Sequence, residues 1–600
     1  MVDVSIDAYL DLPVATSPAW LDGGRIAFIS DASGVPNVWV ARPGEHATAL
    51  TTFSDRVGTL AASPDGRTLV CTVDAGGDER HQLWRLDPAT SDARPLTDAP
   101  ETIHAFGAFD PDGRRVVLAS NGRDPRYFGV SAIDVERPER SPEPVLARDE
   151  HLYPVAVLDD GTLLIRRDNT NLDTDLLRLD RGATDYAMLT PHEGEAAITG
   201  AAFGPDDGSV WCLSNQDRDT AALVRIDPET LRQDVVVSGD WDVESLAVGR
   251  VGPWLAYGTN VDGSSELTLR RRDTGEERAV TGLPLGVADG LRWSPDGQRL
   301  AFAFSGPADP GSIWTCGLDG GATPLLPSAT PPVDLPPFRL PEVIRYATFD
   351  GRLIPAFWYR PVGDGPWPVV VDVHGGPESQ RRTQFAPTTQ CFLARGFAVL
   401  APNVRGSTGY GKAYCHLDDR DLRMDAVADL DAAAGWLAGR DDVMTDRIAV
   451  MGQSYGGFMT LSALVTYPGR WCAGVDVVGI ANFETFLERT GPWRRANRSA
   501  EYGDLERDRE MLRAISPIHA VAQIRVPLLV IHGANDPRVP LHETEQIVEA
   551  VRRHGGRADL VVFDDEGHGL VKRANRVRGY GEVVTFLERL GSAEPVGGEP

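Results

Sequence analysis

The amino-acid sequence predicts two domains of different class. A seven-bladed β-propeller comes first, and an α/β domain with a mostly parallel, doubly wound sheet follows it. Turn signals recur at a nearly constant interval through the first half of the chain, whereas buried strands alternate with helices in the second half. A chain of 600 residues is also too long to fold around a single hydrophobic core.

The repeat in the first half has the length of a propeller blade. An apolar strand follows each turn signal, and a second strand closes each unit, as residues 25–29 and 37–40 illustrate. Four short strands in a unit of about 40–50 residues are typical of a blade. The units predict seven blades over residues 14–325, whereas a β-sandwich, the alternative, would not repeat at a constant interval. The turn signals, which are 43 to 48 residues apart, begin at Asp22, Asp65, Asp112, Asp160, Asp207, Gly252 and Asp296.

A proline-rich segment separates the two halves. We interpret residues 326–341 as a linker, because prolines are frequent there and no periodic apolar pattern continues through them. Strands and helices alternate over residues 342–600, which favours a parallel sheet. Residues 1–13 precede the first blade and form a segment of their own.

Ser454 occupies the most informative position in the chain. A short apolar strand precedes it and a segment with the composition of a helix follows it. A tight turn between them requires small residues on both sides of the serine, which Gly452 and Gly456 provide in the pattern G-x-S-x-G. The turn would expose the hydroxyl of Ser454 and direct the Tyr455 amide toward a developing oxyanion. A glycine-rich loop around an ordinary serine is the alternative.

Two further strands lead to an acid and to a histidine. One buried strand ends shortly before Asp536, and another ends shortly before His568. The order serine, acid, histidine, each beyond the carboxyl end of a strand, is that of α/β-hydrolases. His568 would take the proton of Ser454, while Asp536 would orient the imidazole and stabilise its charged form. Asp564 and Asp565 are too close to His568 in the sequence to hold its ring from behind.

A second glycine-rich loop follows an earlier strand. His374-Gly375-Gly376-Pro377 comes directly after the apolar residues 369–373, where a second contribution to the oxyanion site is expected. We therefore expect the amide of Gly375 or Gly376 to complete this site together with that of Tyr455. His374 is interpreted as a residue that shapes the loop rather than as a second base.

The composition excludes several classes of function. A net charge of −28 argues against nucleic-acid binding, which requires a basic surface. The longest apolar runs are too short to span a membrane, and the acidic start lacks the pattern of a signal peptide. Six scattered cysteines without C-x-x-C spacing are interpreted as reduced thiols of a cytoplasmic protein. We expect no metal ion and no cofactor.

Together these motifs resemble the prolyl oligopeptidase family of serine peptidases over nearly the whole chain. The loop that begins at His374 and a glycine-rich segment after Asn403 look most like the acylaminoacyl-peptidase branch, as do residues 76–84 in the second blade. The matching segments are His374–Pro377, Asn403–Gly411, Gly452–Gly457, Asp536–Pro540 and Gly567-His568.

The resemblance implies roles for further residues. Arg538 matches the family arginine that hydrogen-bonds a substrate carbonyl upstream of the scissile bond, and the alternative is an arginine paired with a nearby carboxylate. Phe483, Phe486 and Trp493 fall where the family builds its specificity pocket, where they would favour an apolar side chain. The alternative for both phenylalanines is a place in the core. In the family the segment before the first blade packs on the hydrolase domain, which implies the same for residues 1–13.

The sequence thus predicts a serine peptidase that hydrolyses short peptides near their N-terminus through an acyl-enzyme, similar to the acylaminoacyl-peptidases. The alternatives are an aminopeptidase that releases single free residues and a dipeptidyl peptidase. The Tyr-Glu-Glu triplet of the dipeptidyl branch is absent, and Glu193 and Glu195 are interpreted as turn residues rather than substitutes.

Two alternatives from other classes remain. An esterase would use the same triad, but a propeller roof suits a peptidase, because it limits entry to small flexible chains. A non-enzymatic propeller scaffold is disfavoured by the complete triad. We expect neither nucleic acid nor membrane as a partner, and the sequence leaves open whether the chain forms a homo-oligomer.

Overall fold

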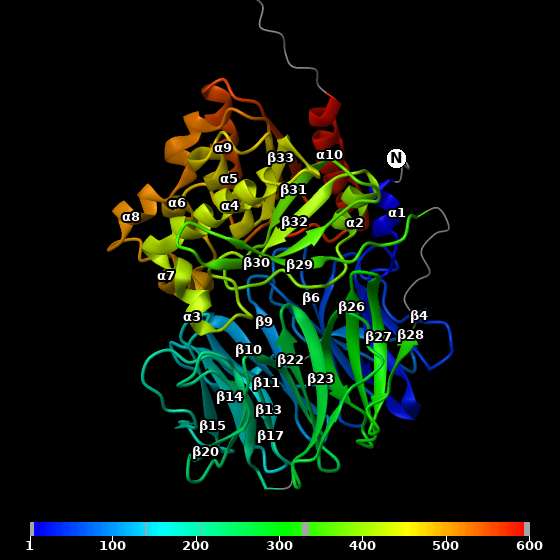
Figure 1. The fold of residues 1–600 in the computed structure, drawn as a ribbon. Helices are drawn as coiled ribbons and strands as arrows, with labels where there is room; N and C mark the ends of the chain where they lie inside the picture. The colour runs from blue at the N-terminus through cyan, green and yellow to red at the C-terminus, as the bar shows by residue number, and fades with distance from the viewer. Residues whose placement is uncertain (1–4, 138–140, 206, 327–334, 593–600) are drawn as a thin grey trace, which may run out of the picture.

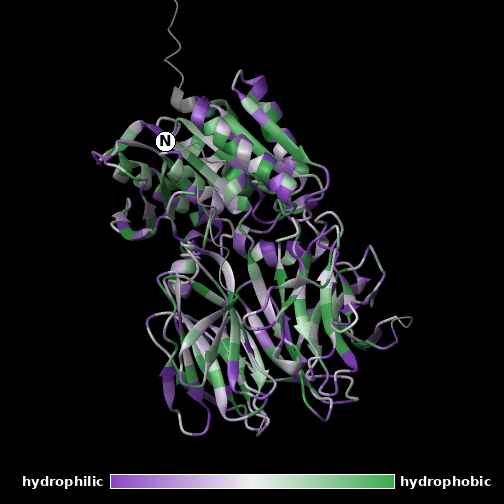
Figure 2. Ribbon diagram, turned by 90° about the vertical axis from the view of Figure 1, so that its right-hand side faces the viewer, coloured by the Kyte–Doolittle hydropathy of each residue, from purple (hydrophilic) through white to green (hydrophobic). Residues whose placement is uncertain are grey.

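The computed structural model describes residues 5–137, 141–205, 207–326 and 335–592. Figure 1 shows two bodies, with the amino-terminal sheets below and the α/β domain above. Hydrophobic residues follow the strands inside both bodies, as the green segments of Figure 2 show. None of the helices within the described residues combines the length and the apolar character that a membrane span requires.

The amino-terminal body consists of antiparallel sheets, each built from strands that are consecutive in the sequence. Two neighbouring groups of four strands join into one eight-stranded sheet through a parallel contact between Phe128 and His151. The strands, group by group, are β1 (Ala15–Trp20), β2 (Ile26–Ser30), β3 (Asn37–Ala41) and β4 (Thr48–Ala49); β5 (Val57–Ala62), β6 (Leu69–Val73), β7 (Gln82–Leu86) and β8 (Ala93–Pro95); β9 (His104–Phe109), β10 (Arg115–Asp124), β11 (Tyr127–Asp134) and β12 (Glu143–Leu146); β13 (His151–Val157), β14 (Leu163–Asp168), β15 (Thr174–Leu179) and β16 (Ala187–Met188); β17 (Ile198–Phe203), β18 (Val210–Ser214), β19 (Ala222–Ile226) and β20 (Gln233–Val237); β21 (Val243–Val248), β22 (Trp254–Val261), β23 (Ser264–Arg271) and β24 (Glu277–Ala279); and β25 (Val287–Trp293), β26 (Arg299–Gly306), β27 (Asp309–Gly317) and β28 (Ala322–Leu326).

The recurrent Asp-Gly turns have a clear structural basis. Asp65 accepts hydrogen bonds from the hydroxyl of Ser63 at 2.6 Å and from the amide of Arg67 at 3.1 Å, so its carboxylate closes the turn. Gly66 takes the left-handed conformation, with φ of +69°, and a Cβ there would lie 2.5 Å from the amide nitrogen of Asp22. The turn therefore requires both residue types, which explains why the pair marks the repeat.

The first and last of these sheets meet without sharing a strand. Side chains of β1, β2, β26 and β27 form one apolar cluster, which includes Phe28, Ala301 and Ile313. The indole of Trp20 donates a hydrogen bond to the carbonyl of Arg292 at 3.0 Å. Within the described residues no backbone hydrogen bond joins the two sheets, so side-chain packing holds them together.

The α/β domain is built on an eight-stranded sheet in the order β29-β30-β32-β31-β33-β34-β35-β36. The pairs β29/β30 and β30/β32 are antiparallel, and the remaining neighbours are parallel. The strands are β29 (Glu342–Ala347), β30 (Leu353–Tyr359), β31 (Trp367–Val373), β32 (Ala398–Pro402), β33 (Val443–Gln453), β34 (Ala473–Val477), β35 (Leu528–Gly533) and β36 (Ala558–Phe563). The helices of the described chain are α1 (Ile6–Leu10), α2 (Pro387–Ala394), α3 (Lys412–Cys415), α4 (Arg423–Ala438), α5 (Tyr455–Thr466), α6 (Phe483–Arg489), α7 (Pro492–Tyr502), α8 (Arg509–Ala514), α9 (Leu541–Arg553) and α10 (Arg573–Ser592).

Helices cover both faces of this sheet. Alternate strand residues such as Val369 and Val371 pack with helices α4, α5 and α9, whereas Val370 belongs to the cluster on the opposite face with α2 and α10. Such continuous apolar strands are expected for a parallel sheet that is buried on both sides.

Helix α1 belongs to the α/β domain although it precedes the first sheet of the other body. Its side chains Ile6 and Tyr9 pack in the cluster formed with α10, and Asp7 accepts a hydrogen bond from Arg573 at 2.7 Å. Residues 1–4 of the predicted amino-terminal segment and residues 327–334 of the predicted linker lie outside the described residues. The six cysteines form no disulfide bonds in the part of the chain that the structure describes.

Candidate active site

Ser454 lies on the sharp turn between β33 and α5. Its backbone is left-handed, with φ of 59° and ψ of −119°, a conformation that non-glycine residues seldom adopt. A Cβ on Gly452 would lie 2.2 Å from the carbonyl oxygen of Gly456, and one on Gly456 would lie 2.3 Å from that of Val373. The two glycines of the motif are therefore required by close backbone contacts on both sides of the serine.

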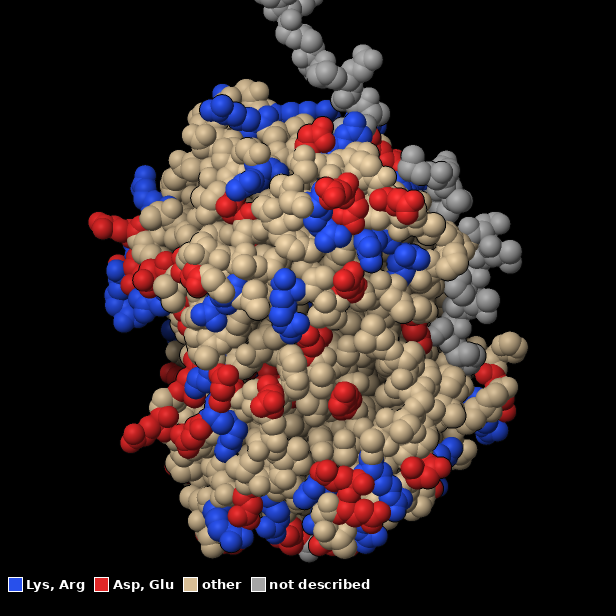
Figure 3. All heavy atoms as spheres, in the orientation of Figure 1, with Lys and Arg blue, Asp and Glu red and all other residues tan. Residues whose placement is uncertain are grey.

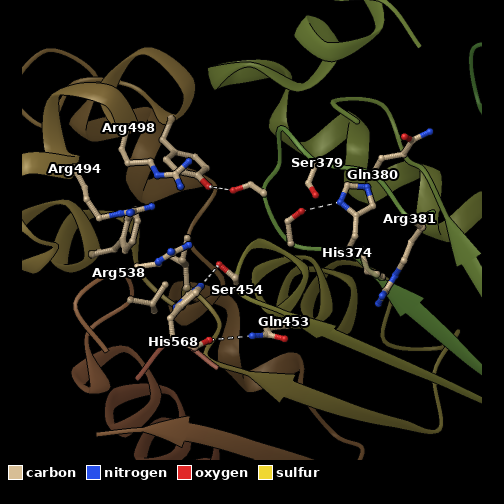
Figure 4. A pocket seen from close by; sticks show the side chains of 17 residues that line it. His374, Ser379, Gln380, Arg381, Gln453, Ser454, Arg494, Arg498, Arg538 and His568 are labelled. Carbon is tan, nitrogen blue, oxygen red and sulfur yellow. Dashed lines mark hydrogen bonds between the residues drawn. The ribbon is translucent and has the colours of Figure 1, made fainter. Parts of the chain in front are cut away.

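The structure brings Ser454, His568 and Asp536 together. The hydroxyl of Ser454 lies 2.9 Å from Nε2 of His568, as the dashed line in Figure 4 marks. On the other side of the ring, Nδ1 of His568 lies 2.7 Å from Oδ2 of Asp536. The three residues come from loops that follow β33, β36 and β35, at one edge of the sheet. This arrangement can pass a proton from the serine to a histidine that a carboxylate orients.

Asp536 is held in the charged form that this arrangement requires. Burial opposes ionisation, but His568 and the backbone amides nearby more than offset it, so the pKa of Asp536 lies below its ordinary value. Its Oδ1 accepts hydrogen bonds from the amides of Arg538 at 2.8 Å and Val539 at 3.0 Å. The turn after β35 thus fixes the carboxylate in place.

The second glycine-rich loop lies beside the serine. Gly375 and Gly376 both line the cavity that contains Ser454, and a Cβ on Gly375 would come within 3.3 Å of the Cβ of Ser454. Tyr455 begins helix α5, so its backbone amide is one of the N–H groups that the helix leaves unbonded. The ring nitrogens of His374 lie 2.8 Å from the Gly375 carbonyl and 2.8 Å from the Ser407 hydroxyl.

The residues expected to bind substrate occupy different environments. Phe486 and Arg538 line the cavity, whereas Phe483 and Trp493 do not. Phe483 is fully buried, and its ring packs against Phe458 with centroids 4.9 Å apart. Trp493 packs against apolar residues of the propeller. The structure therefore gives Phe483 and Trp493 positions in the packing rather than in the cavity wall.

Neither glutamate considered for an amine site reaches the cavity. Glu193 is exposed on a turn. Glu195 lies at the contact between the two bodies, where its Oε1 is 2.6 Å from Nε2 of His416. Side-chain hydrogen bonds with Asp419 and Glu195 raise the pKa of His416 to about 10, so this is an ion pair at neutral pH.

Comparison with known proteins agrees with this geometry. Residues 383–593 match the model of the prolyl oligopeptidase family. The α/β domain belongs to this family. The chain is 28% identical over 613 residues to dipeptidyl aminopeptidase BIII of Pseudoxanthomonas mexicana, a match that spans 96% of this chain and 87% of the relative. It is also 28% identical over 259 residues to the acylamino-acid-releasing enzyme of Rattus norvegicus, which covers 42% of this chain and 35% of the relative.

A solved structure extends the likeness to the whole chain. The crystal structure of puromycin hydrolase superposes with a TM-score of 0.87 at 20% identity, and the match covers 100% of this chain and 98% of that one. This likeness concerns the fold alone. The predicted family, the serine-peptidase class and the order of a propeller followed by an α/β-hydrolase domain are confirmed.

A loop of the propeller rests directly on the catalytic loops of this peptidase. The carbonyl of Gly76 accepts a hydrogen bond from the Asn535 side chain at 3.0 Å. Gly77 lies against the backbone of Gly567, the residue before His568, with no room for a side chain. Glu79 pairs with Arg538 across the boundary, with Oε1 2.5 Å from Nε. The propeller therefore contributes to the surroundings of both the acid and the histidine.

The cavity has a volume of about 410 Å³ and a strongly cationic wall. Arg381, Arg494, Arg498 and Arg538 line it, and no Asp or Glu of the described ranges does. Of these four arginines, only Arg538 could be identified from the sequence. Residues 493–498 carry no recognisable motif, and the three-dimensional packing of α7 brings its arginines to the cavity.

Proposed function

We propose that this peptidase hydrolyses short peptides near their N-terminus through an acyl-enzyme formed on Ser454. The observation that carries the proposal is the continuous contact from the Ser454 hydroxyl through His568 to the ionised Asp536, beside a cavity of peptide dimensions. His568 acts as the base that takes the hydroxyl proton and later as the acid that protonates the leaving amine. Asp536 orients the ring and stabilises its cation.

The negative charge that develops on the attacked carbonyl needs donors in place before reaction. We assign this role to the amides of Tyr455 and of Gly375 or Gly376, which lie on two sides of the serine. Arg538 is assigned to a substrate carbonyl farther along the acyl chain, and Phe486 to the apolar wall of the cavity.

The charge of the cavity favours a blocked substrate N-terminus, as in an acylaminoacyl-peptidase. A free ammonium group that enters a cavity loses its hydration and needs a carboxylate to replace it. Among the residues placed by the structure no carboxylate lines the cavity, and four arginines would repel the ammonium group. An N-acylated residue carries no such charge, so it avoids this cost.

A single observation favours the second candidate, an aminopeptidase of the single-residue or dipeptidyl type. Glu79 projects from the propeller to Arg538 at the edge of the site, and its side chain is 10% exposed. If the Glu79 carboxylate released Arg538 and paired with a substrate ammonium group instead, the enzyme would accept a free N-terminus.

We also propose that the amino-terminal body is a propeller of seven blades. The eight-stranded sheet of β9–β16 would count as two blades, which with the four-stranded sheets makes seven in the described chain. This roof would restrict the cavity to short, flexible peptides.

Substitution of the nucleophile tests the proposal. Ser454→Ala should lower kcat by roughly 10⁴- to 10⁶-fold while the protein remains folded, and a fluorophosphonate should label Ser454 in the wild type alone. The ratio of kcat/KM for acetyl-Leu, free Leu and Gly-Pro anilides then separates the candidates. Cleavage of only the free Leu anilide would establish the aminopeptidase, and cleavage of only the Gly-Pro anilide the dipeptidyl type. Activity that survives in Ser454→Ala would refute the assignment of the nucleophile.

A further inference from the structure

The charge of the catalytic cavity is opposite to that of the chain. The protein has a net charge of −28, and Figure 3 shows acidic and basic side chains interspersed over the visible face. The cavity around Ser454 is nevertheless lined by arginines and, in the part of the chain that the structure describes, by no acidic residue. One of these, Arg381, forms an ion pair with Asp372. The other three lie together on one side of Ser454 in Figure 4.

Carboxylates near the cavity neutralise two of these three arginines. Glu79 pairs with Arg538 at 2.5 Å, and Glu378 pairs with Arg498 at 3.3 Å. The carboxylate nearest to Arg494 in an ion pair is also that of Glu79, with Nη1 4.0 Å from Oε2, and this carboxylate is already paired with Arg538. Among the residues that the structure describes, the guanidinium of Arg494 makes no hydrogen bond, although its side chain is only 21% exposed. Asp536 also acts on the charge of Arg494, but its oxygens are already held by His568 and by two backbone amides. Within the described chain, Arg494 is therefore the arginine of the cavity wall whose guanidinium has no hydrogen-bonded carboxylate.

Arg494 remains charged in this environment. Burial and the charges of Arg498 and Arg538 lower its pKa to about 10, which leaves it protonated at neutral pH. A largely buried guanidinium without a hydrogen-bonded anion is costly, and a carboxylate that approaches it can form two parallel hydrogen bonds. The free enzyme is thus arranged to bind an anion beside its nucleophile.

The position of the arginines indicates which part of the substrate carries that anion. Figure 4 shows His374 and Ser379, from the loop that follows β31, on the opposite side of Ser454 from Arg494, Arg498 and Arg538. When the scissile carbonyl directs its oxygen to this loop, the side chain of the residue that carries it extends toward the arginines. The wall of the cavity also contains Ile480, Phe486 and Val539, which suit the aliphatic part of such a side chain.

We propose that Arg494 selects substrates in which an acidic residue, glutamate or aspartate, contributes the scissile carbonyl. This inference rests on the proposed peptidase function, and it replaces the expected preference for an apolar side chain. The apolar expectation assumed that Phe483, Phe486 and Trp493 line the pocket, and of these only Phe486 does.

A matched pair of substrates tests the proposal on the wild-type enzyme. Glutamyl and glutaminyl p-nitroanilides have nearly the same shape and differ in charge, and both are prepared with acetylated and with free amino groups. We expect kcat/KM to favour the glutamyl compound by about 10- to 100-fold, as for one charged hydrogen-bonded pair. N-acetylglutamate should also protect Ser454 from fluorophosphonate labelling more strongly than N-acetylglutamine does.

Variants then identify the residue responsible. Arg494→Gln should reduce the glutamyl preference by at least about tenfold, and Arg494→Lys should retain part of it. Arg495→Gln is the matched control, since Arg495 is exposed on the same helix and donates to the Glu488 carbonyl, away from the cavity. The control should keep the wild-type preference.

The outcomes separate this inference from the proposed function. If Ser454 is labelled and anilides are cleaved, but the glutaminyl compound is cleaved equally well, the inference fails and the peptidase remains. A preference for a free carboxylate on the leaving group, with no glutamyl preference, would also overturn it by assigning the arginines to the other side of the bond. Absence of both labelling and cleavage would refute the proposed function and the inference together.

Discussion

Substitution of Gly77 by alanine should impair catalysis, although Gly77 lies in the propeller and no residue of the catalytic domain is changed. Gly77 has φ of +81°, and a Cβ there would lie 2.4 Å from the amide nitrogen and 2.9 Å from the Cα of Gly567. Ordinary contact begins at 3.4 Å, so the propeller loop and the His568 loop would have to separate by about 1 Å, because close-packed backbone cannot be compressed.

Two effects follow from this substitution, and they can be separated. A left-handed alanine costs the fold about 1 kcal/mol wherever it occurs. A shift of about 1 Å at a catalytic group lowers the rate by roughly 100-fold, because the His568 ring no longer meets the serine in the reactive geometry. Gly182 is the matched control, since its φ is +78° and no atom lies within 4 Å of the Cβ it would carry.

The assay compares kcat and the thermal unfolding temperature of the wild type, Gly77→Ala and Gly182→Ala on one anilide substrate. We expect both variants to unfold at lowered temperatures, with Gly77→Ala at or below Gly182→Ala because of its backbone overlap, and only Gly77→Ala to lose roughly 100-fold in kcat. Equal kcat in the two variants would refute the reasoning, since it would mean that the contact between the domains does not position His568.

Three further predictions concern other parts of the molecule. Glu79→Gln should keep kcat/KM for acetylated anilides within about tenfold of the wild-type value. If Glu79 is the carboxylate that receives an ammonium group near Arg538, the same variant should lose any cleavage of free aminoacyl anilides. Retained cleavage of free anilides would exclude that role. Burial raises the pKa of Asp476 to about 7, so the folded state keeps a proton that the unfolded chain releases. Wild-type stability should therefore fall by on the order of 4 kcal/mol between about pH 4 and pH 7 relative to Asp476→Asn, and parallel stability curves from chemical denaturation would contradict this. Gly452→Ala should reduce fluorophosphonate labelling of Ser454 by at least about 100-fold, because its Cβ would lie 2.2 Å from a backbone oxygen of the turn; unchanged labelling kinetics would show that the turn tolerates a side chain.

The sequence was most informative where local geometry restricts the choice of residue. The Asp-Gly turns require a carboxylate and a left-handed glycine, and they therefore recur visibly in six of the seven predicted units. Gly452 and Gly456 are equally constrained by backbone contacts around Ser454. The propeller and the candidate nucleophile could accordingly be predicted without a structure.

The cavity wall was less predictable because it depends on packing between distant segments. Phe483 and Phe486 are three residues apart on α6, and sequence alone could not tell which of them faces the cavity. Arg494 and Arg498 resemble the solvated face of an ordinary surface helix, and it is the packing of α7 between the two bodies that buries them. Glu79 is far from Arg538 in the chain, and no local pattern indicates their pairing.

The seam between the first and last sheets of the propeller has a thermodynamic consequence. Apolar side chains, one indole hydrogen bond and the stacking of Arg299 on the Trp20 ring hold it, whereas strands within each sheet are held by backbone hydrogen bonds. Separation of the two sheets would therefore expose hydrocarbon without breaking any ladder, and its free energy would follow the hydrophobic effect, which weakens on cooling. On cooling, the contact between the first and last sheets of the propeller should therefore open before any of the sheets unfolds. Hydrogen exchange at β1 and β26 would remain slow while this contact opens.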